Sequence, residues 1–293
     1  MKRVLVTGGN GFLGSNLVRA LLKEGSSVCV ISRSAGNIAD VLGNVVFLCH
    51  SDLGYSEHAD AILAFSPDVV IHCAWDGGNS YKDVDSLNQV YRNIPSGLDL
   101  IHIISRLSDK PFFVGFGSFA EYGIFSTAVT EASVEAPVTL YGASKLSFKL
   151  ISKQVCEQFA MPWAWVRPLY IFGHGDVPTR LVPSLFRKFV LGEAVVLDSC
   201  NTTIDYLHIR DFCSGVLLIL RLRAQGVYNL CSSRESALKD VVQLIHAATK
   251  SASVVTFDSS LDRSKLNKYA AGDNSKLKGL GWSPSLSLRR GSV

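Results

Sequence analysis

The 293-residue chain has no long uninterrupted apolar run, no block of like charge and no C-x-x-C pair. Because its apolar stretches are short, no segment is expected to cross a membrane. Its 29 Lys and Arg residues outnumber its 25 Asp and Glu residues only slightly, and they are scattered along the chain. This pattern argues against a nucleic-acid-binding surface and is compatible with a small anionic substrate.

The seven cysteines are an odd number, and none has metal-ligand spacing. Cys29, Cys49 and Cys73 fall within apolar strand-like runs, where a small buried thiol is expected. His174 and His208 lack a third ligand at useful spacing, so no metal site is expected. The first residues lead directly into a strand without a signal-peptide core, so we expect a reduced, cytoplasmic protein.

The first half of the chain alternates short β-branched runs with helical patterns, and 47% of all residues are hydrophobic. Strands are expected at residues 4–6, 28–31, 45–48, 69–72, 112–116 and 163–166. Helices are expected at residues 12–24, 56–65, 86–107 and 141–159. Apolar strands of this length, separated by helices, are typical of parallel strands covered on both faces. We therefore predict an α/β fold with a Rossmann-type doubly wound parallel sheet.

A glycine-rich turn lies between the first expected strand and the first expected helix. Gly8, Gly11 and Gly14 fit the spacing of a dinucleotide-binding turn, with Phe12 and Leu13 opening the helix. Glycine permits the tight turn and lets the backbone approach a pyrophosphate at the helix N-terminus. The alternative is an ordinary strand-to-helix loop.

The end of the second expected strand bears on which nicotinamide cofactor binds. An acidic residue there would hold the ribose 2′-hydroxyl, but the chain has Ser32 and Arg33. A guanidinium with neighbouring hydroxyls suits a 2′-phosphate, so NADP(H) is predicted as the preferred cofactor, with NAD(H) possible. The alternative is a solvated arginine on a loop. Asp52 and Leu53 follow the third expected strand and are placed to meet the adenine.

After Pro168 the alternation of strand-like runs and helical patterns becomes less regular. Helical pieces at residues 182–191, 211–222 and 238–249 alternate with short strands at 194–197, 206–209 and 254–257. We predict an NAD(P)-binding Rossmann domain over residues 1–173. A smaller, irregular substrate-binding lobe is predicted over residues 174–293, partly interleaved with the main sheet.

The segment YGASK at residues 141–145 carries the expected chemistry. On a helix, the i,i+4 spacing places the Tyr141 phenol and the Lys145 ammonium on one face, one turn apart. A neighbouring cation favours the phenolate and so lowers the pKa of the tyrosine from about 10. Such a phenol can exchange a proton with a carbonyl or hydroxyl oxygen.

Together with further motifs, the glycine turn and the Tyr-Lys pair resemble an extended short-chain dehydrogenase/reductase. The resemblance is to the NAD-dependent epimerase/dehydratase group acting on nucleotide sugars, and it covers nearly the whole chain. The additional motifs are HCAW at 72–75, Asn93, GSFAEYG at 117–123, RPLYIFG at 167–173, DYLHIRD at 205–211 and GWSP at 281–284.

This resemblance implies roles for individual residues. Ser118 would hydrogen-bond the substrate oxygen, Tyr141 would be the acid/base, and Lys145 would hold the nicotinamide ribose. Implied cofactor contacts also include Cys73, Ala74, Trp75, Asn93, Pro168 and Ile171. Implied substrate contacts are Trp75, Ser118, Phe119, Tyr170, Arg180 and Arg187. Each residue could instead have an ordinary structural role. Ser118 could be a turn serine, Tyr141 an aromatic residue at a helix start, Lys145 a solvated lysine and Trp75 a core tryptophan.

The chain departs from the family pattern in two informative places. Dehydratases of this group carry an Asp-Glu pair directly after the Ser118 position, where this chain has Phe119 and Ala120. Neither can move a proton, so 4,6-dehydratase activity is not expected. Ile204 stands where many relatives have a diphosphate-binding arginine, and Arg180, Arg187 and Lys268 are the candidates to replace it.

The resulting functional prediction is an NADPH-dependent reductase of a nucleotide-linked 4-keto-6-deoxyhexose, acting in deoxysugar biosynthesis. Two alternatives remain open: a nucleotide-sugar 4-epimerase with retained NAD, and a non-catalytic dinucleotide-binding or interaction protein. By resemblance, the helices at residues 86–107 and 141–159 would pair with their copies in a homodimer.

Overall fold

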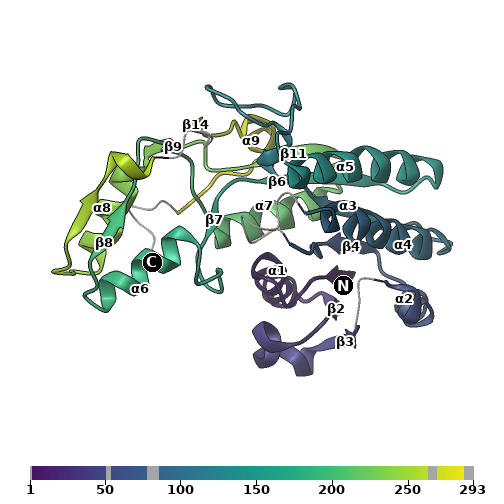
Figure 1. Cartoon of the computed structure of the whole chain (residues 1–293). Helices are drawn as coiled ribbons and strands as arrows, with labels where there is room; N and C mark the ends of the chain where they lie inside the picture. The colour runs from purple at the N-terminus through teal and green to yellow at the C-terminus, as the bar shows by residue number, and fades with distance from the viewer. Residues whose placement is uncertain (1, 51–53, 78–85, 263–268, 287–293) are drawn as a thin grey trace. The chain divides into compact units, whose positions relative to one another are not determined.

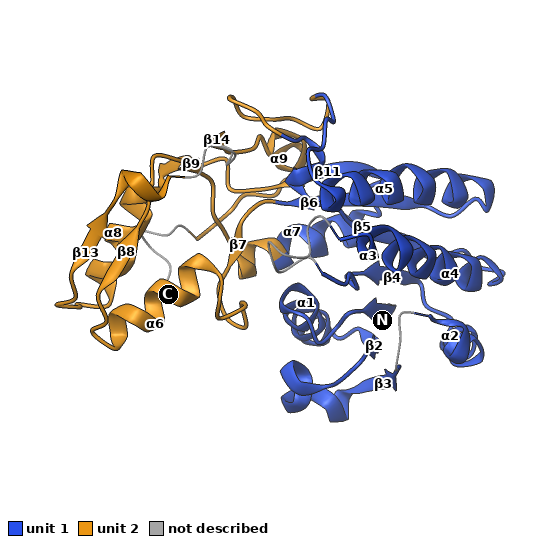
Figure 2. Ribbon diagram, in the orientation of Figure 1, with its two compact units in different colours: residues 1–123, 134–168, 213–228 blue, residues 124–133, 169–212, 229–293 orange. Residues whose placement is uncertain are grey.

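The computed structural model of the chain describes residues 2–50, 54–77, 86–262 and 269–286 (Figure 1). The chain divides into two compact units, each with its own core (Figure 2). Unit 1 comprises residues 1–123, 134–168 and 213–228. Unit 2 comprises residues 124–133, 169–212 and 229–293. The chain passes between the units more than once, so each is assembled from segments distant in sequence.

Within the described residues, seven strands form the main sheet, in the order β11-β6-β5-β4-β1-β2-β3. Their bounds are β1 Arg3–Thr7, β2 Ser27–Ser32, β3 Val45–Cys49, β4 Val69–His72, β5 Phe112–Phe116, β6 Trp163–Pro168 and β11 Gly226–Leu230. Every neighbouring pair from β3 to β6 is parallel. The order runs outward in both directions from β1 and β4, as in a doubly wound sheet. The predicted Rossmann-type sheet is confirmed.

Helices cover both faces of this sheet, and the central strands are therefore buried on both sides. The helices of unit 1 include α1 Phe12–Lys23, α2 Ala59–Phe65, α3 Asn88–Tyr91, α4 Asn93–Ser105 and α5 Leu140–Gln158, and Figure 1 shows α4 and α5 side by side. Leu5, Val70 and Phe113 face α2, α4 and α5 in a single apolar cluster. On the other face, a Cβ on Gly9 would meet both Val30 of the sheet and Val18 of α1.

The prediction of a single helix over residues 86–107 is wrong, because the structure has two helices, α3 and α4. Arg92 separates them with a φ of −103°. Pro95 then occupies the first turn of α4, where its missing N–H costs nothing. In a continuous helix the same proline would interrupt the hydrogen-bond ladder, so the break lies just before it.

Short 3₁₀ segments also precede helices or follow strands, at η1 Gly36–Asn44, η2 Ser56–His58 and η3 Phe119–Glu121.

Unit 2 is built from short elements around a smaller apolar core. Its helices include α6 Leu181–Val190, α8 Leu238–Ala248, α9 Ser275–Gly279 and the start of α7 Ile209–Leu222, with η4 at Ser259–Leu261. Its strands pair as β7 Ile171–Phe172 with β10 Leu207–His208, β8 Val195–Leu197 with β13 Val255–Phe257, and β9 Thr203–Ile204 with β12 Ser236–Ala237 and β14 Tyr269–Ala270. Leu185, Phe189 and Val241 lie at the centre of the core.

The three cysteines expected to be buried differ in their exposure. Cys29 is buried, as expected, and Cys73 is partly buried. The expectation that Cys49 is buried is wrong: this residue is exposed at the end of β3, one of the two edge strands of the sheet. Among the described helices, none combines the length and apolarity that crossing a bilayer requires.

Candidate active site

The loops that follow β1 and β4 meet where the strand order of the sheet reverses. The Thr7 Oγ1 and His72 Nδ1 atoms lie 2.8 Å apart at the ends of the two strands. The Ala74 amide donates to the same Thr7 oxygen at 3.3 Å. In open α/β sheets, ligands bind beyond the carboxyl ends of the strands at such a reversal. This place is therefore the first candidate for a ligand site.

The glycine turn has the backbone geometry that a bound pyrophosphate needs. Gly8 has a φ of +66°, and a Cβ there would lie 2.7 Å from the Ala74 nitrogen. A Cβ on Gly14 would collide with the Gly8 carbonyl oxygen. Gly11 is the N-cap of α1, and the first turn of this helix has no acidic residue and no side-chain cap. Phe12 and Leu13 open the helix as predicted. A helix N-terminus without acidic or capping side chains is suited to an anion, so these residues fit a dinucleotide.

Arg33 follows β2 and is available to a ligand. Its side chain is 60% exposed, and its Nη1 lies 3.7 Å from Asp76 Oδ1. The other oxygen of Asp76 pairs with Arg92 at 3.0 Å, so Arg33 makes the longer of the two contacts. Ser32, at the end of β2, is buried. Asp52 and Leu53 lie outside the described residues, as does Lys268.

Asn10, which the sequence analysis did not single out, ties the glycine turn to the segment after β2. Its Nδ2 donates to Ser34 Oγ at 2.7 Å, and its Oδ1 accepts from the Asn37 amide at 2.5 Å. An asparagine inside a glycine turn is a signal that could have been noticed, because its short amide side chain readily bonds nearby backbone.

Asn93 holds the loop that follows β4. Its Oδ1 accepts from the Asp76 amide at 2.7 Å, and its Nδ2 donates to the Asp76 carbonyl at 3.0 Å. Trp75, one residue earlier, donates its indole N–H to Gln89 Oε1 at 2.7 Å. Because Gln89 and Asn93 are both buried, the loop that carries Cys73, Ala74 and Trp75 has a fixed path.

Helix α5 carries Tyr141 and Lys145 on one face, as the spacing predicted. Thr139 caps the helix by accepting from the Gly142 amide at 3.1 Å. The Lys145 ammonium donates to the Phe116 carbonyl at 2.8 Å, and it lies 3.7 Å from the centre of a Trp75 ring. The same ammonium is 5.9 Å from the centre of the Tyr141 ring. The indole of Trp75 meets Tyr141 edge-on, with ring centres 6.5 Å apart. The structure thus brings Trp75, Tyr141 and Lys145 together.

Burial dominates the electrostatics of Lys145. Loss of water lowers the pKa of its amine to about 7, although Glu121 and Cys73 act in the opposite direction. Nearby, burial and then the charge of Lys145 lower the pKa of His72 to about 3, so this imidazole is neutral. An amine with a pKa near 7 changes charge in the range where enzymes work. The lowered pKa of Tyr141 stays a prediction.

The shifted pKa of Lys145 makes stability depend on pH. The unfolded amine keeps its proton up to about pH 10.5, whereas the folded amine releases it near pH 7. The unfolded chain therefore binds more protons between these values, so the contribution of Lys145 to stability rises with pH across this window. From pH 7 to pH 9, the cofactor-free wild type should gain roughly 2 kcal/mol more than Lys145→Met. Urea unfolding of both proteins at the two pH values measures this, and equal gains would contradict it.

Ser118 lies in a tight loop directly after β5. It caps η3: its Oγ accepts from the Ala120 amide at 3.1 Å, and its own amide donates to Glu121 Oε1 at 2.9 Å. The loop presses on α5, because a Cβ on Gly142 would collide with the Ala120 carbonyl oxygen. The loop of Ser118 and the turn of α5 that holds Tyr141 are therefore in direct backbone contact.

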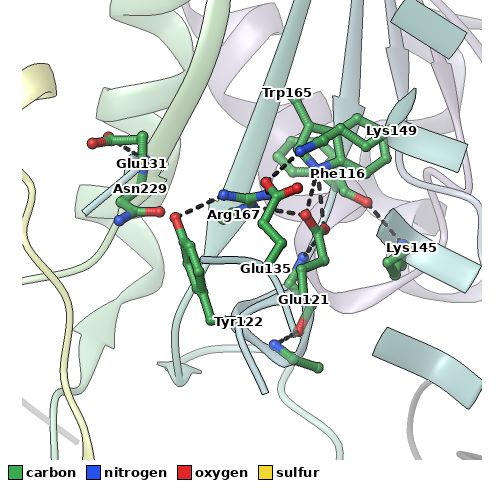
Figure 3. A network of polar contacts seen from close by, with 12 residues as sticks. Phe116, Glu121, Tyr122, Glu131, Glu135, Lys145, Lys149, Trp165, Arg167 and Asn229 are labelled. Carbon is green, nitrogen blue, oxygen red and sulfur yellow. Dashed lines mark hydrogen bonds and ion pairs between the residues drawn. The ribbon is translucent and has the colours of Figure 1, made fainter. Parts of the chain in front are cut away.

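Behind this loop lies a run of paired charged side chains that we call the buried charge chain: Glu121, Arg167, Glu135 and Lys149 (Figure 3). The Arg167 Nε donates to Glu121 at 2.7 Å, and another guanidinium nitrogen donates to Glu135. Lys149 of α5 also donates to Glu135. Glu121 and Arg167 are fully buried. Glu121 and Arg167 belong to the motifs GSFAEYG and RPLYIFG, but the motifs alone do not predict their pairing. The S-x-x-E spacing of Ser118 and Glu121, typical of a capping box, is the local signal for the contact at the Ser118 loop.

One known protein family matches most of the chain. The model of the NAD dependent epimerase/dehydratase family matches residues 4–231. The chain belongs to this family. Among its relatives, the low-salt glycan biosynthesis protein Agl12 of Haloferax volcanii is 27% identical, over 98% of this chain and 95% of that protein. The dTDP-6-deoxy-L-talose 4-dehydrogenase (NAD(+)) of Aggregatibacter actinomycetemcomitans is 23% identical, over 82% of this chain and 88% of that protein.

Solved structures of other family members share the fold. The UDP-glucose 4-epimerase of Thermus thermophilus, solved with NAD, superposes with a TM-score of 0.86 at 23% identity. The match covers 98% of this chain and 97% of that one. At this level of identity the similarity shows a shared fold.

The remaining predicted contacts of this epimerase/dehydratase family member lie in several elements. In unit 1, Phe119 is buried against Tyr122, and Pro168 ends β6. In unit 2, Ile171 opens β7, and Tyr170 is 48% exposed with a φ of +37°. Arg180 pairs with Asp176 at 3.2 Å before α6, and Arg187 is exposed on that helix. Ile204, in place of the usual arginine, is buried in β9. The binding roles of these residues stay predictions.

Proposed function

We propose that this chain is an NADPH-dependent reductase of a nucleotide-linked 4-keto-6-deoxyhexose. The observation that carries the proposal is the placement of Tyr141 and Lys145 on one face of α5, with the Ser118 loop pressed against the start of that helix. Support also comes from the relative whose name places an oxidoreduction at carbon 4 of a dTDP-linked 6-deoxysugar. Reduction of a 4-keto sugar is the same chemistry in the opposite direction.

In this proposal each residue has a physical task. The glycine turn and the N-terminus of α1 would hold the pyrophosphate of NADPH, and Lys145 would hold the nicotinamide ribose. The cofactor held there would supply the hydride. The Ser118 Oγ accepts a hydrogen bond from the Ala120 amide, so the hydroxyl hydrogen of Ser118 remains for a bond to the substrate carbonyl. Tyr141 delivers the proton to that oxygen as negative charge develops there.

The function is tested by following NADPH oxidation with a panel of 4-keto-6-deoxy sugars linked to GDP, dTDP, CDP and UDP. We expect turnover with at least one of them. Absence of turnover across the panel would discard the reductase assignment.

Arg33 is the residue through which we expect NADPH to be preferred. Loss of one charge-assisted contact to the 2′-phosphate costs about 1.5–3 kcal/mol, so Arg33→Ala should raise the KM for NADPH roughly 10- to 100-fold. The KM for NADH should change little, because NADH has no phosphate at that position. Arg106→Ala, which removes an exposed arginine at the end of α4, is the control. A wild type that clearly prefers NADH would refute the assignment.

A nucleotide-sugar 4-epimerase is the alternative, supported by a relative, the UDP-glucose 4-epimerase of Halalkalibacterium halodurans, which is 25% identical over 84% of this chain and 80% of that protein. It would use Ser118, Tyr141 and Lys145 in the same places, so these residues do not separate the two reactions. The cofactor does. NAD that stays bound through purification would favour the epimerase, whereas freely exchanging NADPH would favour the reductase.

A further inference from the structure

We infer that the buried charge chain is a positioning device that holds the Ser118 loop in register with the Tyr141 face of α5. This inference rests on the proposed function, because it assigns a task to residues around the same catalytic group. Glu121, Arg167, Glu135 and Lys149 are positioning residues here, since they act through Ser118 and Tyr141.

At one end, the chain fixes the backbone of Ser118. Glu121 accepts from the Ser118 amide at 2.9 Å and from the Trp165 indole at 3.0 Å. A Cβ on Gly117 would collide with both the Glu121 carboxylate and the Trp165 indole. The carboxylate is therefore closely packed between Gly117 and the Trp165 indole, and its bond to the Ser118 amide ties the loop to it.

At the other end, the chain is anchored on the catalytic helix. Lys149 lies one turn after Lys145 and two turns after Tyr141, so all three share a face of α5. The Lys149 side chain is 9% exposed and pairs with Glu135. Since Glu135 also accepts from Arg167, the contacts run without a gap from the helix to the loop.

The chain is held in its charged form. Burial opposes ionisation of Glu135, but hydrogen bonds from Lys149 and Arg167 outweigh it and leave its pKa below the usual value. Burial likewise opposes the charge of Arg167, yet Glu121 and Tyr122 raise its pKa above the ordinary value. Apolar side chains of similar volume often stabilise a fold as well as buried ion pairs do. What paired charges add is a directional constraint, since each donor must meet its acceptor at a set distance and angle.

The test compares two lysines of α5. Lys149→Met removes the helix anchor, whereas Lys153→Met removes a half-exposed lysine paired with Glu157 on the same helix. We expect Lys149→Met to lower kcat roughly 10- to 100-fold with little change in the KM for NADPH, as a small misplacement of catalytic groups does. Amide hydrogen exchange in residues 117–123 should become at least several-fold faster. Lys153→Met should change neither quantity, and Lys149→Arg should recover most of the kcat.

The result that overturns the inference is unchanged exchange in residues 117–123 together with unchanged kcat in folded Lys149→Met. If that variant does not fold, the double variant Glu135→Gln/Lys149→Met replaces it, because it leaves no carboxylate without its lysine. The exchange measurement also separates the two proposals. A wild type that reduces no keto sugar removes the proposed function, while the exchange rates still decide whether Lys149 holds the loop.

Discussion

Tyr141→Phe is expected to reduce kcat by about 10²- to 10⁴-fold, the usual contribution of a positioned general acid or base. Phenylalanine keeps the ring that meets Trp75 edge-on and removes only the hydroxyl. Helix α5 should therefore stay intact, with Lys145 still bound to the Phe116 carbonyl. The measurement is NADPH oxidation with the sugar that the wild type reduces.

Two comparisons make the Tyr141 result specific. The Kd for NADPH should change less than about threefold, because the phenol is needed for proton transfer rather than for holding the pyrophosphate. Tyr91→Phe, in an exposed tyrosine of α3, should leave kcat unaltered. Turnover that survives Tyr141→Phe would refute the catalytic role and favour a non-catalytic dinucleotide-binding protein.

Arg167→Met is expected to be the most destabilising change in the buried charge chain. It leaves the fully buried Glu121 without its guanidinium, and removing one partner of a buried ion pair costs about 3–5 kcal/mol. Glu135, whose side chain is 23% exposed, would keep only Lys149. Tyr122 would also lose a 2.7 Å hydrogen bond from the guanidinium. Denaturant unfolding monitored by tryptophan fluorescence measures the loss in unfolding free energy.

Arg221→Met is the matched comparison for Arg167→Met. Arg221 also pairs with a glutamate, Glu24, at 3.0 Å, but the two side chains are 64% and 41% exposed. Exposed pairs contribute about 0.2–1 kcal/mol, so this variant should lose no more than that. Similar losses in the two variants would mean that the buried pair is no more important to stability than the exposed one.

The sequence predicted unit 1 well because its strands are buried on both faces and read as short apolar runs. Strand β4 begins and ends at the predicted residues, and α1 differs by a single residue at its end. The break between α3 and α4 was missed because the apolar pattern continues across Arg92. The two-residue strands of unit 2, such as β9, pair with segments that are distant in sequence. Strands this short are too brief to show an alternation of apolar and polar residues, so the sequence did not predict them.

The site was predicted where a motif is local and missed where contacts join distant segments. The i,i+4 pair of Tyr141 and Lys145 is fixed by helix geometry alone. Glu135, by contrast, lies in an irregular segment, and only the fold shows that it meets residues from β6 and α5. Lys149 has the sequence character of a solvated helix residue, and its burial depends on that same long-range pairing.

The exposure of Cys49 has a practical consequence for spectroscopy. Burial raises the pKa of the Cys29, Cys73, Cys156, Cys200, Cys213 and Cys231 thiols, which makes them poor nucleophiles at neutral pH. Cys49 lies instead on the outer edge of the sheet, with its sulfur 3.6 Å from the Arg33 carbonyl. A maleimide dye attached there would report on the end of β2 where the adenosine half of a dinucleotide is expected, without any engineered cysteine.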